Sequence, residues 1–151
     1  MTRMSAVERK EPPVVPDLSH VGRRYLAPGQ VVSADWVAEY ASAVSGADEV
    51  YSPGSVPPTF AAVYCLLPSL AEVLRDPELG IELAGLIHAE QSFEWPVPVR
   101  LGDVVAASAE IAAVESKRGM TFVTLDLAAT NQSGHTVCRG RSLLLLRGAG
   151  R

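Results

Sequence analysis

The sequence is short of cysteine, of basic charge and of long apolar runs, and each shortage excludes a class of protein. Its two cysteines, Cys65 and Cys138, lie far apart and form no CxxC pair, which excludes a disulfide framework and fits a reducing compartment. Lys and Arg number 13 against 17 Asp and Glu, so the formal net charge is −4 and the basic excess that nucleic-acid binding requires is absent. No apolar run reaches the roughly 18 residues of a membrane helix, and the N-terminus lacks the apolar core of a secretory signal. We therefore expect a cytoplasmic protein that binds neither nucleic acid nor membrane.

The remaining composition is that of a globular domain. Hydrophobic residues make up 48% of the 151 residues and charged residues 20%, which excludes wholesale disorder, and the length suits one domain. Residues 1–20 are rich in proline and show no periodicity. This pattern predicts a flexible N-terminal tail in which His20 is exposed to solvent. The domain itself is expected to span residues 21–148.

Two helices are predicted. Ser33 is placed to cap a helix over residues 34–45, whose apolar side chains recur at helical spacing. A second helix is expected over residues 58–75, with Thr59 capping its first turn. Because apolar side chains face every direction on this second helix, we expect it to be buried. Pro68 lies inside it and should kink or split it, because proline lacks the N–H and clashes with the preceding turn.

From Leu86 onward the pattern changes to strands, at about residues 87–95, 104–114, 120–130 and 135–147. The loop between the last two carries a hairpin signal. In the first strand, strict alternation places His88 on the face opposite Phe93 and Trp95, away from the core. The order of helix, buried helix and strand meander predicts an α+β fold, in which an antiparallel sheet wraps a long central helix.

Six short segments of the sequence, taken in order, resemble one protein family. They are Gly22–Tyr25, Ala43–Gly46, Val56–Phe60, Ile87–Glu94, Pro98–Asp103 and Thr130–Gly134. Together they are similar to the MaoC-like dehydratase/enoyl hydratase family, which implies a hot-dog fold. The resemblance is greatest to small N-terminal-type actinobacterial members, such as the substrate-binding subunit of the mycobacterial hydroxyacyl dehydratases.

The family chemistry implies candidate catalytic residues near the start of the second helix. Reversible addition of water to a 2-enoyl thioester needs a carboxylate and an imidazole that hold one water. Asp48 corresponds to the family's carboxylate with a one-residue shift, and Tyr51 stands where the family has a histidine, so the motif is degenerate. His88 is a third candidate, because Glu90 on the same strand face is placed to orient it. The simpler interpretations are a polar turn at Asp48, a cover over the pocket mouth at Tyr51, and a structural histidine at a dimer interface.

The same resemblance implies substrate contacts along the second helix. Free backbone N–H groups at Thr59 and Phe60 would polarise the thioester carbonyl. Tyr64 and Leu67 lie further along this helix and would line an acyl tunnel, for which ordinary core packing is the alternative interpretation. The sequence contains no metal-ligand cluster and no phosphate loop, so we expect neither a metal nor a cofactor.

These implications favour a (3R)-hydroxyacyl-thioester dehydratase or enoyl hydratase component that acts on acyl chains bound to CoA or to acyl carrier protein. The degenerate motif indicates either the substrate-binding half of a heterodimer with a second MaoC-like chain, or a homodimer with a reduced site. Two alternatives stay open. One is a non-catalytic module that binds acyl or polyketide chains, and the other is a repurposed hot-dog enzyme, such as a thioesterase or cyclase, in natural-product biosynthesis.

Overall fold

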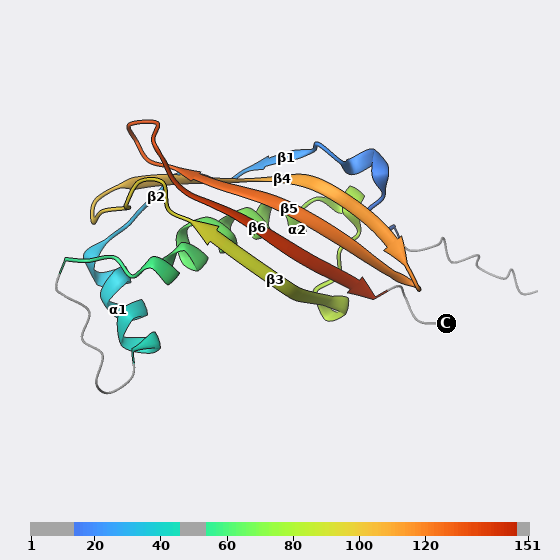
Figure 1. Ribbon diagram of the computed structural model, residues 1–151, viewed down its shortest axis with the longest axis horizontal. Helices are drawn as coiled ribbons and strands as arrows, with labels where there is room; N and C mark the ends of the chain where they lie inside the picture. Colours follow the sequence, from blue (N-terminus) through green and yellow to red (C-terminus); the bar gives the residue numbers. More distant parts are fainter. Residues whose placement is uncertain (1–13, 46–53, 148–151) are drawn as a thin grey trace, which may run out of the picture.

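An antiparallel sheet curves over one long helix (Figure 1). The computed structural model describes residues 14–45 and 54–147. The strand order in the sheet is β1-β4-β5-β6-β3, and β2 also pairs with β4. These strands are β1 (Arg24–Leu26), β2 (Gln30–Val31), β3 (Leu86–Glu94), β4 (Val104–Lys117), β5 (Met120–Thr130) and β6 (Thr136–Arg147). The predicted α+β fold, with an antiparallel sheet around a central helix, is therefore confirmed.

The first helix, α1 (Ala34–Val44), lies where the sequence predicts it. The hydroxyl of Ser33 accepts a hydrogen bond from the backbone N–H of Trp36 at 3.2 Å, which confirms the predicted cap. Trp36 and Tyr40 contact the ring of Phe60 nearly edge-on, with ring centroids 5.4 and 5.2 Å away. Through these aromatic contacts, α1 packs against the start of the central helix.

The central helix takes three forms along its length. It consists of a 3₁₀ turn, η2 (Pro58–Phe60), a π turn, η3 (Ala62–Leu66), and a regular helix, α2 (Leu67–Leu74). The backbone N–H of Leu67 donates to the carbonyl of Ala62, five residues back. Pro68 follows directly; it has no N–H to donate, and its ring would crowd the carbonyl four residues back in a regular helix. The helix is therefore disrupted next to Pro68, as predicted, and the disruption takes the form of the π turn η3, which is wider than a regular turn.

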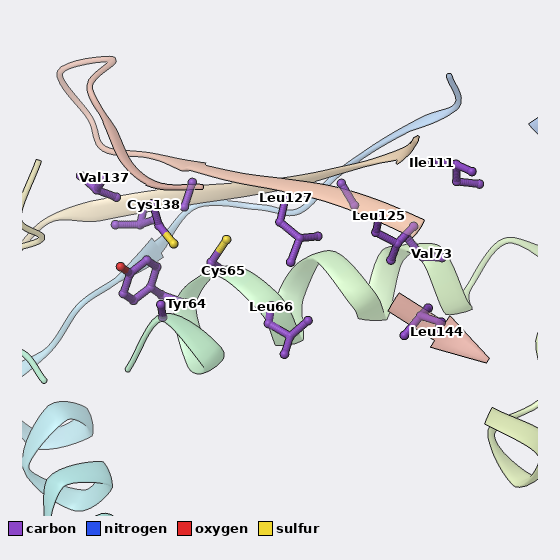
Figure 2. Close-up of a cluster of buried hydrophobic side chains, with 14 of the residues drawn as sticks. Tyr64, Cys65, Leu66, Val73, Ile111, Leu125, Leu127, Val137, Cys138 and Leu144 are labelled. Atoms are coloured by element: carbon purple, nitrogen blue, oxygen red, sulfur yellow. The ribbon is translucent and has the colours of Figure 1, made fainter. Parts of the chain in front are cut away.

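The core lies between this helix and the sheet. Side chains of β4, β5 and β6 alternate between buried and more exposed positions along most of each strand, as expected for a sheet with one face covered. Figure 2 shows the buried layer, in which side chains of β5 and β6 face those of the helix. Among the fully buried side chains are Phe60, Tyr64, Cys65, Val73, Ile111, Val123, Leu125, Val137, Cys138 and Leu144.

A β-bulge in β3 overturns the alternation predicted for this strand. The register shifts between His88 and Glu90, so that His88 pairs with Leu144 of β6 whereas Glu90 pairs with Leu143. Residues directly opposite in a sheet share a face, and Leu144 points into the core. His88 therefore lies on the same face as Phe93, and the prediction that the two lie on opposite faces is wrong. The extra residue in the bulge is the physical reason.

The chain just before the first strand packs against the domain. Pro16 is fully buried, and His20, at the end of the short helix η1 (Leu18–His20), is only 8% exposed. The imidazole Nδ1 of His20 accepts a hydrogen bond from the backbone N–H of Asp17 at 3.1 Å. The prediction that His20 is exposed to solvent is therefore wrong, because this capping box folds its ring back over the turn.

Two further 3₁₀ turns lead from the central helix to β3. They are η4 (Pro77–Leu79) and η5 (Leu83–Gly85). Gly80 ends the first of them in the left-handed region, with φ of 57°, and a Cβ placed on it would lie 2.2 Å from the carbonyl oxygen of Val14. Only glycine fits this close approach of the two segments.

Candidate functional site

An apolar pocket of about 280 Å³ lies beside the start of the central helix. The helix start supplies one wall, and the chain that follows β3 supplies the other. The lining residues are Val56, Pro57, Pro58, Tyr64, Trp95, Pro98 and Val99. Small-molecule sites have this character, with apolar walls and a few polar groups, and the volume stands near the lower end of their usual range of about 300–1,000 Å³.

Hydrogen bonds accepted by a buried carboxylate hold the wall that follows β3. Asp103, only 8% exposed, accepts the backbone N–H of Arg100 at 2.9 Å and the side-chain amide of Gln132 at 3.0 Å. The amide oxygen of Gln132 in turn accepts the backbone N–H of Val104 at 2.9 Å. Asp103 therefore closes the turn after Val99 and ties it to the loop between β5 and β6.

Tyr64 is the buried polar residue of the pocket. Its side chain is 1% exposed, and its hydroxyl has no hydrogen-bond partner among the described residues. The sulfur of Cys138 and the indole of Trp95 lie near this oxygen without a hydrogen bond of normal geometry. Burial, reinforced by the neighbouring Cys138 and Cys65, raises the pKa of Tyr64 well above its ordinary value. The phenol therefore stays protonated and is available as a hydrogen-bond donor.

Two free thiols lie behind this tyrosine. The sulfurs of Cys65, on η3, and Cys138, on β6, point toward one another between the helix and the sheet (Figure 2). Both side chains are fully buried. The Cys138 sulfur and burial together raise the pKa of the Cys65 thiol. Cys65 therefore lacks the exposed thiolate character of a reactive cysteine.

Of the four predicted substrate-binding residues, Tyr64 lines the pocket and the other three do not. Phe60 is fully buried against Trp36, Tyr40 and Tyr64, and its N–H already donates to the carbonyl of Pro57 at 2.9 Å. The expectation of a free N–H at Phe60 is therefore wrong.

Thr59 and Leu67 lie on the outside of the helix. Thr59 is exposed, and no side chain caps the first turn. Its predicted capping role is wrong, because Pro57 is the capping residue and Pro58 occupies the first helical position, which places Thr59 inside the turn. Leu67 is 58% exposed, so it is not a wall of the described pocket.

Of the three predicted catalytic residues, His88 alone lies within the described part of the chain, and it does not line this pocket. Asp48 and Tyr51 lie outside the described residues. His88 is exposed and precedes Trp95 by seven residues, roughly 23 Å along an extended strand. Because of the bulge, Glu90 lies on the opposite face of β3 from His88, so the predicted orientation of His88 by Glu90 is wrong.

Sequence analysis missed Trp95, Pro98 and Val99 as pocket residues. Their position beside the helix start depends on how β3 pairs with β6, which the local sequence does not reveal. The available signal was the segment Pro98–Asp103, one of the six that carry the family resemblance.

Comparison with known proteins is consistent across sequence and structure. A family model described as the FAS1-like dehydratase domain region matches residues 19–139. A UPF0336 protein of Streptomyces griseus subsp. griseus is 31% identical over 146 residues, which cover 88% of this chain and 96% of that protein.

Two solved structures have the same fold. The complex named HadBC, a (3R)-hydroxyacyl-ACP dehydratase of Mycobacterium tuberculosis, contains a chain with a TM-score of 0.63 and 23% identity, covering 83% of this chain and 96% of that one. A MaoC-like dehydratase of Rhodospirillum rubrum has a TM-score of 0.61 and 18% identity, covering 87% and 94%. No helix within residues 14–45 and 54–147 is long and apolar enough to cross a bilayer.

Proposed function

Because the chain belongs to the MaoC-like hot-dog dehydratase family, we propose that it is the substrate-binding component of a cytoplasmic (3R)-hydroxyacyl-thioester dehydratase or enoyl hydratase. Its substrates are acyl chains carried by CoA or by acyl carrier protein. The observation that supports this function best is the apolar pocket at the start of the central helix. An acyl group needs such a pocket, and the positive end of a helix dipole beside it suits a polarised thioester carbonyl.

The lining of the pocket favours binding over unaided catalysis. Within the described part of the chain, its seven residues include no carboxylate and no imidazole, yet hydration of an enoyl thioester needs a general acid and base. In this proposal a second MaoC-like chain supplies both groups; the dehydratase HadBC, which has the same fold, is itself described as a complex. Asp48 and Tyr51 remain this chain's own candidates, since they precede Pro58, the first residue of the helix, by ten and seven positions.

The outer edge of β3 is the surface proposed for this partner. In the described residues, β3 pairs with β6 on one side and has no neighbour on the other. An open strand edge is a template for another strand, and apolar side chains flank this edge, with Ile87 and Trp95 each 41% exposed. Edge-to-edge pairing would extend the sheet across two chains. His88 then has a structural role near the interface.

The test is to measure binding and turnover on the same purified chain. Butyryl-CoA binding is measured by calorimetry, and hydration of crotonyl-CoA by loss of the enoyl thioester absorbance. We expect binding, but turnover about 10²–10⁴-fold below that of an efficient (R)-hydratase. Tyr51 stands where the family has a histidine, and a tyrosine, whose ordinary pKa is near 10, cannot replace an imidazole as the general base. Adding a second MaoC-like chain that carries both the carboxylate and the histidine of the family should restore turnover. Fast hydration by the chain alone, or no acyl-CoA binding, contradicts the proposal.

The same lining also favours a second candidate function, a non-catalytic module that binds and shields acyl or polyketide chains. The two functions differ in one result. If acyl-CoA binds but no second MaoC-like chain produces hydration, the binding module is correct.

A further inference from the structure

The connection from β3 to β4 carries one wall of the apolar pocket. It consists of residues 95–103, which lie outside the strand ladder, and its residues Trp95, Pro98 and Val99 line the pocket. Its position therefore depends on side-chain packing and on the hydrogen bonds of the turn at residues 100–103, just before β4.

Three segments of the chain meet at this turn. Gly102 donates its backbone N–H to the carbonyl of Val32 at 2.8 Å, and the carbonyl of Asp103 accepts the N–H of Val32, also at 2.8 Å. The turn is thereby tied to the residue just before Ser33, the cap of α1. The third segment is the loop between β5 and β6, which Figure 1 shows at the same end of the sheet as the chain that leads into β4.

Gln132, in that loop, bridges two groups of the turn with the two ends of one amide. Its nitrogen donates to one oxygen of the Asp103 carboxylate at 3.0 Å, and its oxygen accepts the backbone N–H of Val104 at 2.9 Å. The other oxygen of Asp103 accepts the N–H of Arg100 at 2.9 Å. A carboxylate that is only 8% exposed needs these donors, because a buried charge without hydrogen bonds is costly.

The surroundings of Gln132 suit a role in placing the turn. The residue is exposed, so it buries little apolar surface, yet its long side chain gives up rotamer freedom to hold both bonds. The loop that carries it is itself held, since the side-chain oxygen of Asn131 accepts the N–H groups of Ser133 and His135 at 3.1 and 3.0 Å. Gln132 therefore connects a well-held loop to the turn that follows the pocket wall.

We propose that Gln132 is a positioning residue, which holds the turn at residues 100–103, and with it the pocket wall at Pro98 and Val99, where the wall contacts the bound acyl group. The ligand is the acyl thioester of the proposed function, on which this inference rests. Gln132 acts through the turn, because it is not part of the pocket lining. A wall that moves away loses van der Waals contact with the acyl chain, and affinity falls.

The test changes the bridge and leaves the pocket lining intact. In Gln132→Glu a carboxylate replaces the amide that donates to Asp103, so two acidic groups face each other and the bridge is lost. We expect butyryl-CoA to bind about three- to tenfold more weakly at neutral pH, the range of one net hydrogen bond, as measured by calorimetry. Ser133→Glu is the matched control. It adds the same charge at the next residue, which is also exposed, without touching the bridge, so affinity should stay that of the wild type.

A double variant that combines Asp103→Asn with Gln132→Glu restores the bridge with its two groups exchanged. The new asparagine amide donates to one oxygen of the new glutamate, whose other oxygen accepts the Val104 N–H. The asparagine oxygen accepts the Arg100 N–H as before. All three hydrogen bonds form again, so butyryl-CoA affinity should return to within about twofold of the wild type.

Thermal unfolding of the same variants separates positioning from a merely structural role. A structural glutamine would lower the melting temperature in Gln132→Glu and leave the affinity of the folded chain unchanged, and that result overturns the positioning role. An affinity loss that the double variant does not recover, or that Ser133→Glu shares, overturns it too. In each of these cases the wild type still binds butyryl-CoA and the proposed function stands. Failure of the wild type to bind butyryl-CoA overturns the proposed function and this inference with it.

Discussion

Gly140 of β6 lies where a side chain would collide with the neighbouring edge strand, β3. A Cβ atom built on it would lie 2.8 Å from the carbonyl oxygen of Ser92 and 3.0 Å from a ring carbon of Phe93. Real Cβ atoms do not approach a backbone oxygen so closely, so β3 would have to move. The absence of a side chain at Gly140 therefore fixes the distance between β6 and β3.

We expect Gly140→Ala to lower the free energy of unfolding by about 1–3 kcal/mol, because the added methyl overpacks this contact. Chemical denaturation measures the change. Gly85→Ala is the matched control: the nearest heavy atom from elsewhere in the chain that a Cβ there would meet is the carbonyl oxygen of Arg147, at an ordinary 3.7 Å, so its effect should stay within about 0.5 kcal/mol. Equal stability of the two variants would show that β3 moves aside at no cost.

At the scale of elements, one carboxylate joins the first strand to the end of the central helix. An oxygen of Asp76, just after α2, accepts hydrogen bonds from the guanidinium of Arg23 at 2.7 Å and from the hydroxyl of Tyr25 at 2.8 Å. Burial works against ionisation of Asp76, but the hydrogen bonds from Arg23 and Tyr25 outweigh it and lower its pKa. Burial and the bond to Asp76 raise the pKa of Tyr25 to about 12.

These two shifts predict losses of stability at both ends of the pH range. Because the pKa of Asp76 is lower in the folded chain, its interactions stabilise the fold fully at pH values above its unfolded-state pKa of about 3.9. This stabilisation is lost as the pH falls through the folded-state pKa of Asp76. Because the pKa of Tyr25 is raised in the folded chain, its interactions stabilise the fold fully below its unfolded-state pKa of about 10. This stabilisation is lost as the pH rises through the folded-state pKa of about 12. Urea unfolding measured from pH 2 to 12 checks both.

Asp76→Asn should reduce stability at neutral pH and flatten the acid limb, and Tyr25→Phe should flatten the alkaline limb. Asp126→Asn is the control for a surface pair, since Asp126 bonds Arg141 on the exposed face of the sheet at 2.7 Å and such pairs contribute little. An acid limb identical in the wild type and Asp76→Asn would contradict the role given to Asp76.

Elements whose signals are local were predicted well. Ser33 caps α1 where expected, and Asn131 closes the loop before β6 by accepting the N–H groups of Ser133 and His135, which suits the predicted hairpin. The face of His88 was not predictable, because the bulge in β3 inserts a residue without any local signature. Pro68 indicated that the central helix is disrupted, but the form of that disruption, a π turn, depends on how the helix packs.

At the scale of the whole molecule, the open edge of β3 predicts assembly. We expect the chain to sediment as a dimer at micromolar concentration, alone or with its partner, because pairing satisfies the unpaired backbone groups of that edge. Ile87→Lys should shift it to monomer, since a charge beside the edge opposes pairing. Val31→Lys, at a similarly exposed residue of β2, should leave the dimer intact. A wild type that sediments as a stable monomer in both settings would rule out this interface.

The sequence was informative on the fold as a whole and less so on the site. The succession of periodicities was enough for an antiparallel sheet around a helix, but not for the position of β3 beside β6, because that contact joins segments far apart in the chain. The pocket depends on that same contact through Trp95 and Val99. Tyr64 was predicted to line it because its place on the buried helix is set locally.

The π turn of the central helix changes the spacing at which its residues are buried. Ala61, Cys65, Ser69 and Val73 are all fully buried, each four residues after the last. In a regular helix of about 3.6 residues per turn, a step of four overshoots a full turn by about 40°, so three steps would rotate Val73 about 120° away from Ala61. The π turn contains one more residue per revolution than an α turn, and this cancels most of the rotation between Ala61 and Val73. One seam of the helix can therefore follow the sheet from end to end, and a strict repeat of four marks the place where the helix had to widen.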